Sequence, residues 1–235
     1  MPRYLCFVAT LLVVVVTGAG RADTLWYNGD FDQSLPLKGL LNIKNTGAAS
    51  LNARVYDDFE VSGSGWNVTD VYANVLAQTQ DTALFLGAEY EIRSGVSTGK
   101  GGTLVPNVTG TTATYVPTTR TYGSSYEYTI RISGLNLSLV EGTYWLMVRP
   151  VTDELETYVT ATSGAYAVGN PAGPNGNSFS TNTPDSFFSL VEGTADFSMG
   201  IEGTSSVVPA PSAFVGLVGM GLMGLLVGLR RRFKR

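Results

Sequence analysis

Short segments with alternating apolar and polar residues constrain this chain of 235 residues more than any other feature. The clearest is 126–132, in which Tyr128, Ile130 and Ile132 stand at every second position. Successive side chains of a β-strand point to opposite faces, so this spacing predicts a strand with one buried face. Helical periodicity is hard to find between residues 23 and 206, where glycine-rich turns separate the segments. The sequence therefore predicts an all-β domain over this span.

The same pattern predicts further strands at 51–61, 66–75, 83–92 and 194–201. We expect an irregularity at Asp57-Asp58, where two acidic residues interrupt the alternation of the first of these. Many short strands between Gly-rich turns favour an antiparallel two-sheet sandwich with jelly-roll-like connectivity.

Two connections have recognisable turn chemistry. Alternating leucines at 135–139, a tight turn at Glu141-Gly142 and the apolar segment 143–149 predict a β-hairpin. Pro150 is expected to end its second strand or to place it at a sheet edge. Residues 163–184 are rich in Gly, Asn, Ser and Pro, which predicts a long loop of the kind that often carries function.

The N-terminus has the order of a secretory signal peptide. Arg3 precedes an apolar run over 5–16, and the small residues Gly20 and Ala22 precede Asp23. This order predicts a signal peptide over 1–22 that is cleaved before Asp23. An uncleaved anchor is the alternative, although the run is shorter than the ~20 residues that a spanning helix needs.

The C-terminus contains an uncharged run over 213–229, followed by a basic segment over 230–235. The run is at the lower end of the length that crosses a bilayer, and flanking basic residues stay in the cytoplasm. These features predict a transmembrane helix and a basic cytoplasmic tail, with a buried helix of a soluble domain as the alternative. The exported domain would then span 23–203, and 204–212 would be a linker.

Two short motifs flank the apolar run, namely Val208, Pro209, Ala210, Pro211 and Ser212 before it and Arg230, Arg231 and Arg232 after it. Together with the signal peptide, this order resembles exported bacterial proteins that carry a PEP-CTERM sorting signal. That family usually has Pro-Glu-Pro, and here Ala210 stands in place of the Glu. The resemblance implies processing by an exosortase-type membrane protease, transient anchoring in the inner membrane, and a final location at the cell surface or in the extracellular matrix.

Motifs along the rest of the chain resemble a group of uncharacterised exported β-sandwich domains, which often carry the same kind of tail. The matching segments are 26–32, 54–59, 65–69, 91–95, 142–146, 176–178 and 196–200. This resemblance implies architecture and surface location and brings no known catalytic residues.

The charge and composition of the exported span exclude several function classes. It holds eight Lys and Arg against 19 Asp and Glu, so that its formal net charge is −11. Nucleic-acid binding needs phosphate-neutralising Lys and Arg, and we expect no such partner. The span contains no histidine, and Cys6 lies in the signal peptide. Ser-His-Asp catalysis, Cys-His catalysis and His/Cys zinc sites are therefore excluded.

The densest carboxylates suggest a calcium site, because Ca²⁺ takes six to eight oxygen ligands from carboxylates and loop carbonyls. The candidate ligands are Asp30, Asp32, Asp57, Asp58 and Glu60. A solvated acidic strand edge is the alternative. Ca²⁺ is the one cofactor that the sequence suggests.

Aromatic residues suggest carbohydrate binding, because exposed flat rings stack on sugars. The candidates are Trp26, Trp66 and Trp145, with core packing as the alternative for each. Tyr144 and Trp145 are neighbours in a predicted strand, so we expect one in the core and the other at the outside or an edge.

The leading hypothesis is a non-enzymatic exported protein that associates with extracellular polysaccharide. A calcium-assisted carbohydrate-binding module is the second hypothesis. A glycan hydrolase or lyase is the third, using two carboxyl groups among Asp58, Glu89, Glu91 and Glu141. Ordinary surface charge is the alternative interpretation of these four residues.

Overall fold

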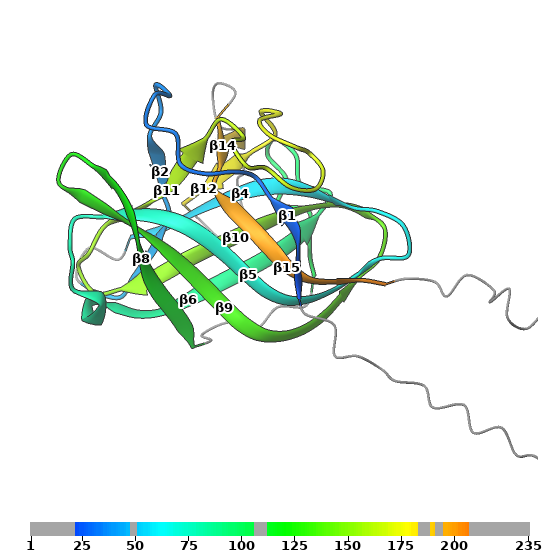
Figure 1. Cartoon of the computed structure of the whole chain (residues 1–235), viewed down its shortest axis with the longest axis horizontal. Coiled ribbons are helices and arrows are strands. Elements are labelled where there is room, and N and C mark those ends of the chain that lie inside the picture. The colour runs from blue at the N-terminus through cyan, green and yellow to red at the C-terminus, as the bar shows by residue number, and fades with distance from the viewer. Residues whose placement is uncertain (1–21, 48–50, 106–111, 183–188, 191–194, 207–235) are drawn as a thin grey trace, which may run out of the picture.

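The computed structural model describes residues 22–47, 51–105, 112–182, 189–190 and 195–206. This part of the chain forms two curled sheets of mostly antiparallel strands and one short 3-10 helix, η1 (Thr82–Leu84) (Figure 1). The all-β prediction is confirmed, and the arrangement is consistent with a two-sheet β-sandwich. Apart from residue 22, the predicted signal peptide lies outside the described residues, as do the sorting motif, the helix over 213–229 and the basic tail.

The first sheet contains the strand nearest to each end of the predicted exported domain. Its main order is β1 (Asp23–Tyr27), β15 (Met199–Ser205), β5 (Trp66–Ala77), β11 (Thr157–Thr162) and β14 (Asp196–Phe197). Off this path, β2 (Gly39–Leu41) pairs with β11, and β9 (Ser125–Leu139) pairs with β5 and with β8 (Ala113–Tyr122).

The second sheet has the order β13 (Ser189–Leu190), β12 (Phe179–Thr181), β4 (Asn52–Val61), β3 (Ile43–Asn45), β10 (Gly142–Thr152), β6 (Phe85–Ser94) and β7 (Thr103–Val105). β10 also pairs directly with β4. Only the β10–β3 pair is parallel among the strand pairs of the described residues.

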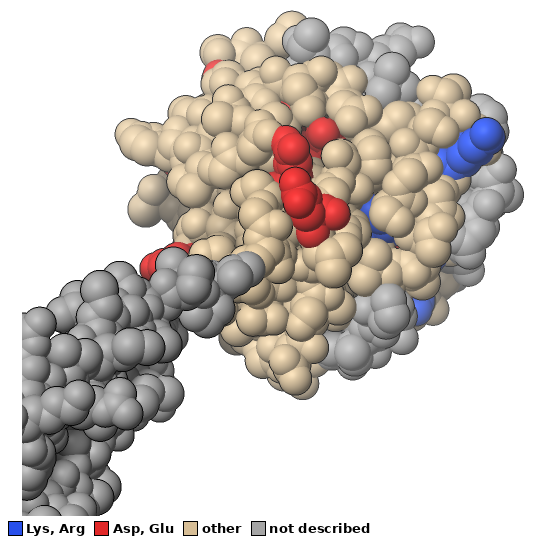
Figure 2. Space-filling view, turned by 90° about the vertical axis from the view of Figure 1, so that its right-hand side faces the viewer, with Lys and Arg blue, Asp and Glu red and all other residues tan. Residues whose placement is uncertain are grey.

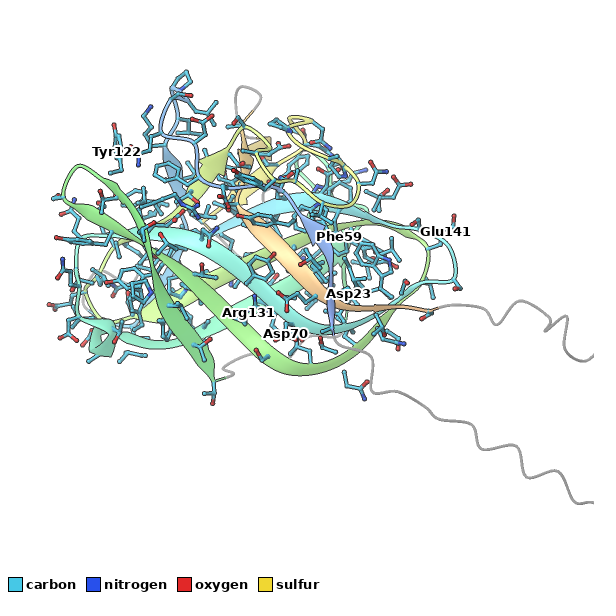
Figure 3. All side chains as sticks on the ribbon, viewed as in Figure 1. Asp23, Phe59, Asp70, Tyr122, Arg131 and Glu141 are labelled. Atoms are coloured by element: carbon cyan, nitrogen blue, oxygen red, sulfur yellow. The ribbon has the colours of Figure 1, made fainter. Side chains whose placement is uncertain are left out.

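The main core lies between the two sheets and follows from the alternation in the sequence. Along β4, Val55, Phe59 and Val61 point into this core, whereas Tyr56 belongs to a second cluster on the other face. Phe59 has no exposed surface, and Figure 3 shows it inside the sandwich. Burying one large apolar side chain stabilises the folded state by about 1.5–3 kcal/mol, and this burial holds the two sheets together.

Most predicted strands are confirmed. The segments 51–61, 66–75 and 83–92 correspond to β4, β5 and β6, and 126–139 forms the single strand β9. The segment 194–201 pairs back into the first sheet as β14 and β15, with a break at Ser198. β15 continues to Ser205, two residues past the predicted domain limit. The predicted loop is confirmed over 163–178, and β12 follows it.

The expected irregularity at Asp57-Asp58 is wrong. β4 pairs with β10 without a register shift from Val61, opposite Gly142, to Asp57, opposite Leu146. The strand stays regular because side-chain and backbone donors satisfy the Asp57 carboxylate within the interior.

The predicted hairpin at 135–149 is also wrong, because its two strands lie in different sheets. Leu139 pairs with Trp66 of β5, whereas Gly142 pairs with Val61 of β4. The turn between β9 and β10 therefore crosses from one sheet to the other, as the turn between β4 and β5 also does. Both connections lie at the right-hand end of the molecule (Figure 1).

Pro150 neither ends β10 nor places it at a sheet edge. The strand continues to Thr152, and Pro150 pairs with Ala88 of β6. On the other side of β10, pairing with β4 stops at Leu146 and pairing with β3 begins at Val151. Pro150 lies in this gap, where no strand ladder requires its missing N–H.

The two ends of the described domain leave it together. β1 and β15 are antiparallel neighbours, with Asp23 opposite Gly203. Ser205 in turn lies opposite Trp66, at the start of β5. Both ends therefore belong to one end of the sandwich, while Ala77, at the other end of β5, lies near η1 and the start of β6.

Candidate functional site

The three tryptophans are buried. Trp26, Trp66 and Trp145 expose 0%, 6% and 7% of their surfaces. Phe59 packs against two of them, with ring centroids 5.5 Å from Trp26 and 5.8 Å from Trp66. The prediction that these rings stack on sugars is therefore wrong, since the sandwich needs them as core residues.

Trp145 is covered by the loop that follows β11. Its Nε1–H donates to the carbonyl of Asn177 at 3.0 Å, and its ring packs edge-on against Phe179. Tyr144 points the other way into the main core, so the prediction of opposite faces is confirmed. The expectation that one of the two would lie at the outside is wrong, because Trp145 is also buried. The loop thus buries a face of the second sheet that would otherwise be in solvent.

Asp30 and Asp32 each have partners of their own. Asp30 accepts a hydrogen bond from the Tyr27 hydroxyl at 2.5 Å and pairs with Arg120 at 2.7 Å. Asp32 accepts from the backbone and side chain of Ser34. Hydrogen bonds from Ser163 and Ser34 lower the pKa of Asp32 to about 2. Both carboxylates therefore stabilise the chain after β1.

The other predicted metal ligands lie along β4. Asp57 points between the sheets, and its neighbour Asp58 points to the opposite face. Asn170 of the long loop donates to Glu60. No group of three or more His, Cys, Asp or Glu is placed to hold a metal ion among the described residues. These residues thus contain no calcium site built from the five predicted carboxylates.

Asp57, Asp58 and Asp196 form a buried group that we call the acidic cluster. Their exposed fractions are 0%, 5% and 0%. Asp57 accepts from Asn28 Nδ2 at 2.9 Å and from the backbone N–H of Phe197 at 2.5 Å.

Asp58 and Asp196 hold the long loop in place. Asp58 accepts two hydrogen bonds from the Asn175 side chain, at 2.9 and 3.0 Å. Asp196 accepts from the backbone N–H groups of Asn175 and Gly176. The acidic cluster therefore fastens the loop to β4 and β14.

The protonation of the acidic cluster differs from that of surface aspartates. Burial and the charge of Asp196 raise the pKa of Asp57 well above its usual value. Burial also raises the pKa of Asp58, and it raises that of Asp196 to about 6. The hydrogen-bond donors described for these carboxylates are amides and backbone N–H groups, so their charges have no basic partner among them.

The remaining carboxylates that suggested hydrolysis do not meet in one cleft of the described structure. Glu89 lies between Lys44 and Arg149. Glu91 pairs with Arg54 and Arg93. Ion pairs of this kind favour a structural role for both glutamates.

Glu141 lies at the right-hand end of the molecule, in the turn after β9 (Figure 3). A line of acidic side chains runs over this end, and the Lys and Arg side chains in view lie to its right (Figure 2). This end of the domain is therefore unsuited to an anionic partner.

A pocket of about 400 Å³ lies near the opposite end, between β6, β8 and the segment around β3. Its lining includes Lys44, Phe85, Leu86, Glu89, Tyr115 and Val151. The sequence pattern singled out only Glu89 among these residues, because the others look like ordinary strand residues. The volume is within the range of small-molecule sites.

Comparisons with protein-family models, with curated proteins and with solved structures find no match for this chain. The described residues also contain no helix with the length and apolar character needed to cross a membrane.

Proposed function

We propose that this chain is an exported bacterial protein without enzymatic activity, which its C-terminal signal delivers to the cell surface or the extracellular matrix. The observation that carries the proposal is the three-part tail. It has a Pro-x-Pro motif at 209–211, an uncharged run at 213–229 and a basic end at 230–235. The partners in this proposal are the membrane, through the tail, an exosortase-type protease and extracellular polysaccharide.

The geometry of the domain is compatible with display from a membrane. β1 and β15 pair with Asp23 opposite Gly203, so the predicted signal-peptide junction and the tail leave from the same end. The pocket lies near the other end of β5, which spans 12 residues or about 40 Å. A domain tethered by its tail would thus hold the pocket away from the bilayer.

The proposal includes two structural details. The sandwich has jelly-roll-like connectivity, and the run at 213–229 is a transmembrane helix until the tail is removed. Calcium is not part of the proposal, because the predicted ligands do not gather at one site.

Cell fractionation combined with intact-mass analysis of the native protein tests this function. We expect the exported form to begin at Asp23 and to lack the tail after about Ser212. An intact tail in the inner membrane would contradict sorting and leave a simple membrane-anchored domain. Recovery in the cytoplasm with residues 1–22 attached would overturn export altogether.

Two variants sharpen the test. Ala210→Glu restores the usual motif of the family and is expected to increase the processed fraction. Pro211→Ala removes half of the motif and is expected to leave the unprocessed form in the membrane. Equal processing of both variants and the native chain would show that the motif is not read.

A further inference from the structure

Lys44 and Glu89 line the pocket near the far end of β5, and the buried Arg149 contacts Glu89 from outside the lining. Glu89 accepts from Lys44 on one oxygen and from Arg149 Nη2 on the other, at 2.7 Å. Hydrogen bonds and charges from these two cations outweigh burial and lower the pKa of Glu89. One ionised carboxylate therefore faces two cations, which leaves a local charge of +1.

Of the two cations, Lys44 is the one that is exposed to the pocket. Arg149 exposes 1% of its surface, and its other donors go to Asn52 and to the carbonyls of Ile43 and Ala53. The Lys44 side chain is 44% exposed and lines the pocket. An ammonium has three N–H donors and Glu89 takes one, so others remain for a bound molecule.

The Tyr115 ring also lines this space. Its hydroxyl is buried beside the backbone of Gly87, so the ring and not the hydroxyl faces a bound molecule. Burial raises the pKa of Tyr115 to about 12, so the side chain is uncharged at neutral pH.

The wall of the pocket is apolar. The Phe85 and Tyr115 rings stack with centroids 4.6 Å apart and planes 12° from parallel. Leu86 is 59% exposed beside them.

We propose that this pocket binds a small ring-shaped ligand that carries a carboxylate, the chemistry of a uronic acid. Lys44 receives the carboxylate, and the ring lies on the wall formed by Phe85, Leu86 and Tyr115. The choice of a sugar acid rests on the proposed association with polysaccharide. The preference for an anion rests on the charges of Lys44, Arg149 and Glu89 alone.

Calorimetric titration of the purified full-length protein in mild detergent tests this inference, with sodium glucuronate, glucose and sodium acetate as probes. We expect glucuronate to bind at least about tenfold more tightly than glucose, because glucose lacks the carboxylate that the Lys44 ammonium receives. Acetate should bind more weakly than glucuronate, because it has no ring to lie on the wall.

Lys44→Gln is expected to abolish the preference for glucuronate over glucose. Lys100→Gln is the matched control, since it removes the same charge from an exposed residue outside the pocket and should keep the preference. Tyr115→Ala removes part of the ring wall and should weaken glucuronate and glucose alike.

Equal affinity for glucuronate and glucose would overturn the inference, as would equal affinity for glucuronate and acetate or no binding of any probe. These comparisons use the native protein and decide the question even if a variant does not fold. Fractionation and binding report on different parts of the chain, so export can fail while binding holds, and the reverse.

Discussion

The acidic cluster and the Glu89–Arg149 pair are both buried groups of charged residues, and they compensate their buried charges in opposite ways. The acidic cluster surrounds its carboxylates with amides and backbone N–H groups, and the pKa values of its aspartates rise. Glu89 is surrounded by two cations, and its pKa falls. One site reduces its charge by binding protons, and the other neutralises it with a countercharge.

The difference indicates which site responds to pH. The ion pair keeps its charges across the neutral range, because an arginine does not lose its proton in proteins. The acidic cluster gains or loses protons within that range, since the pKa of Asp196 is about 6. We therefore expect the first site to provide constant stability and the second to make the loop at 163–178 sensitive to pH.

The largest expected effect comes from Arg149→Met. The change leaves Glu89 with only the exposed Lys44 as a partner. It also removes the N–H groups that donate to the Asn52 side chain and to two backbone carbonyls. Breaking a buried pair costs about 3–5 kcal/mol of unfolding free energy. Urea denaturation measures the loss. A value below that of Arg131→Gln, whose side chain and carboxylate partners are all partly exposed, would contradict the role of the pair.

A smaller effect is expected from pH. An acid whose pKa is raised on folding binds more protons in the native state, so the unfolding free energy falls as pH rises between the two pKa values. For Asp196 this window runs from its usual 3.8 to about 6, and the loss is about 3 kcal/mol. Urea denaturation at several pH values measures this slope.

Asp196→Asn isolates the contribution of the acidic cluster, because the amide keeps one acceptor for the loop backbone and removes the titration. The slope between pH 4 and pH 6 should become shallower in this variant. An unchanged slope would assign the pH dependence to other groups.

Asn175→Ala tests how the cluster fastens the loop. The change removes two hydrogen bonds to Asp58, which are worth about 1–2 kcal/mol in total. Limited proteolysis should then cut faster within 163–178. Asn136→Ala alters an exposed residue of β9 and serves as the control, with no change expected in this segment. Equal cleavage of both variants would show that Asp58 does not hold the loop.

The smallest effect on stability is expected from Lys44→Gln. The side chain is 44% exposed, and exposed ion pairs contribute about 0–1 kcal/mol. The contrast with Arg149→Met sharpens the assignment, because both residues contact the same glutamate. A loss as large as that of Arg149→Met would show that the two cations share the neutralisation of Glu89 equally.

Much of the strand content was predictable because alternation in β4, β5, β6 and β9 reports which side chains are buried. The pairing of the strands was harder to predict from the sequence than their positions. Glu141-Gly142 has the composition of a hairpin turn, yet the same residues join two sheets. The residues of a turn determine that the chain reverses direction. Contacts with strands that are distant in the sequence determine which strand each of the two flanking strands pairs with.

One member of the acidic cluster could be predicted as buried from the sequence, and its partners could not. Asp57 occupies the inward position in the alternation of Val55, Phe59 and Val61, and this position marks it as a buried carboxylate. Asn28 and Asp196 come from segments that lie far from Asp57 in the sequence. Only tertiary structure brings them to Asp57.

The position of β15 has a consequence for the order in which the strands can pair during synthesis. This last strand lies between β1 and β5, so β1 has no sheet neighbour until residues 199–205 arrive. Synthesis proceeds from the N-terminus, and the first sheet therefore stays incomplete until nearly the whole domain has been made. Late completion of this sheet keeps the chain unfolded for longer during synthesis, which would suit the export that we propose.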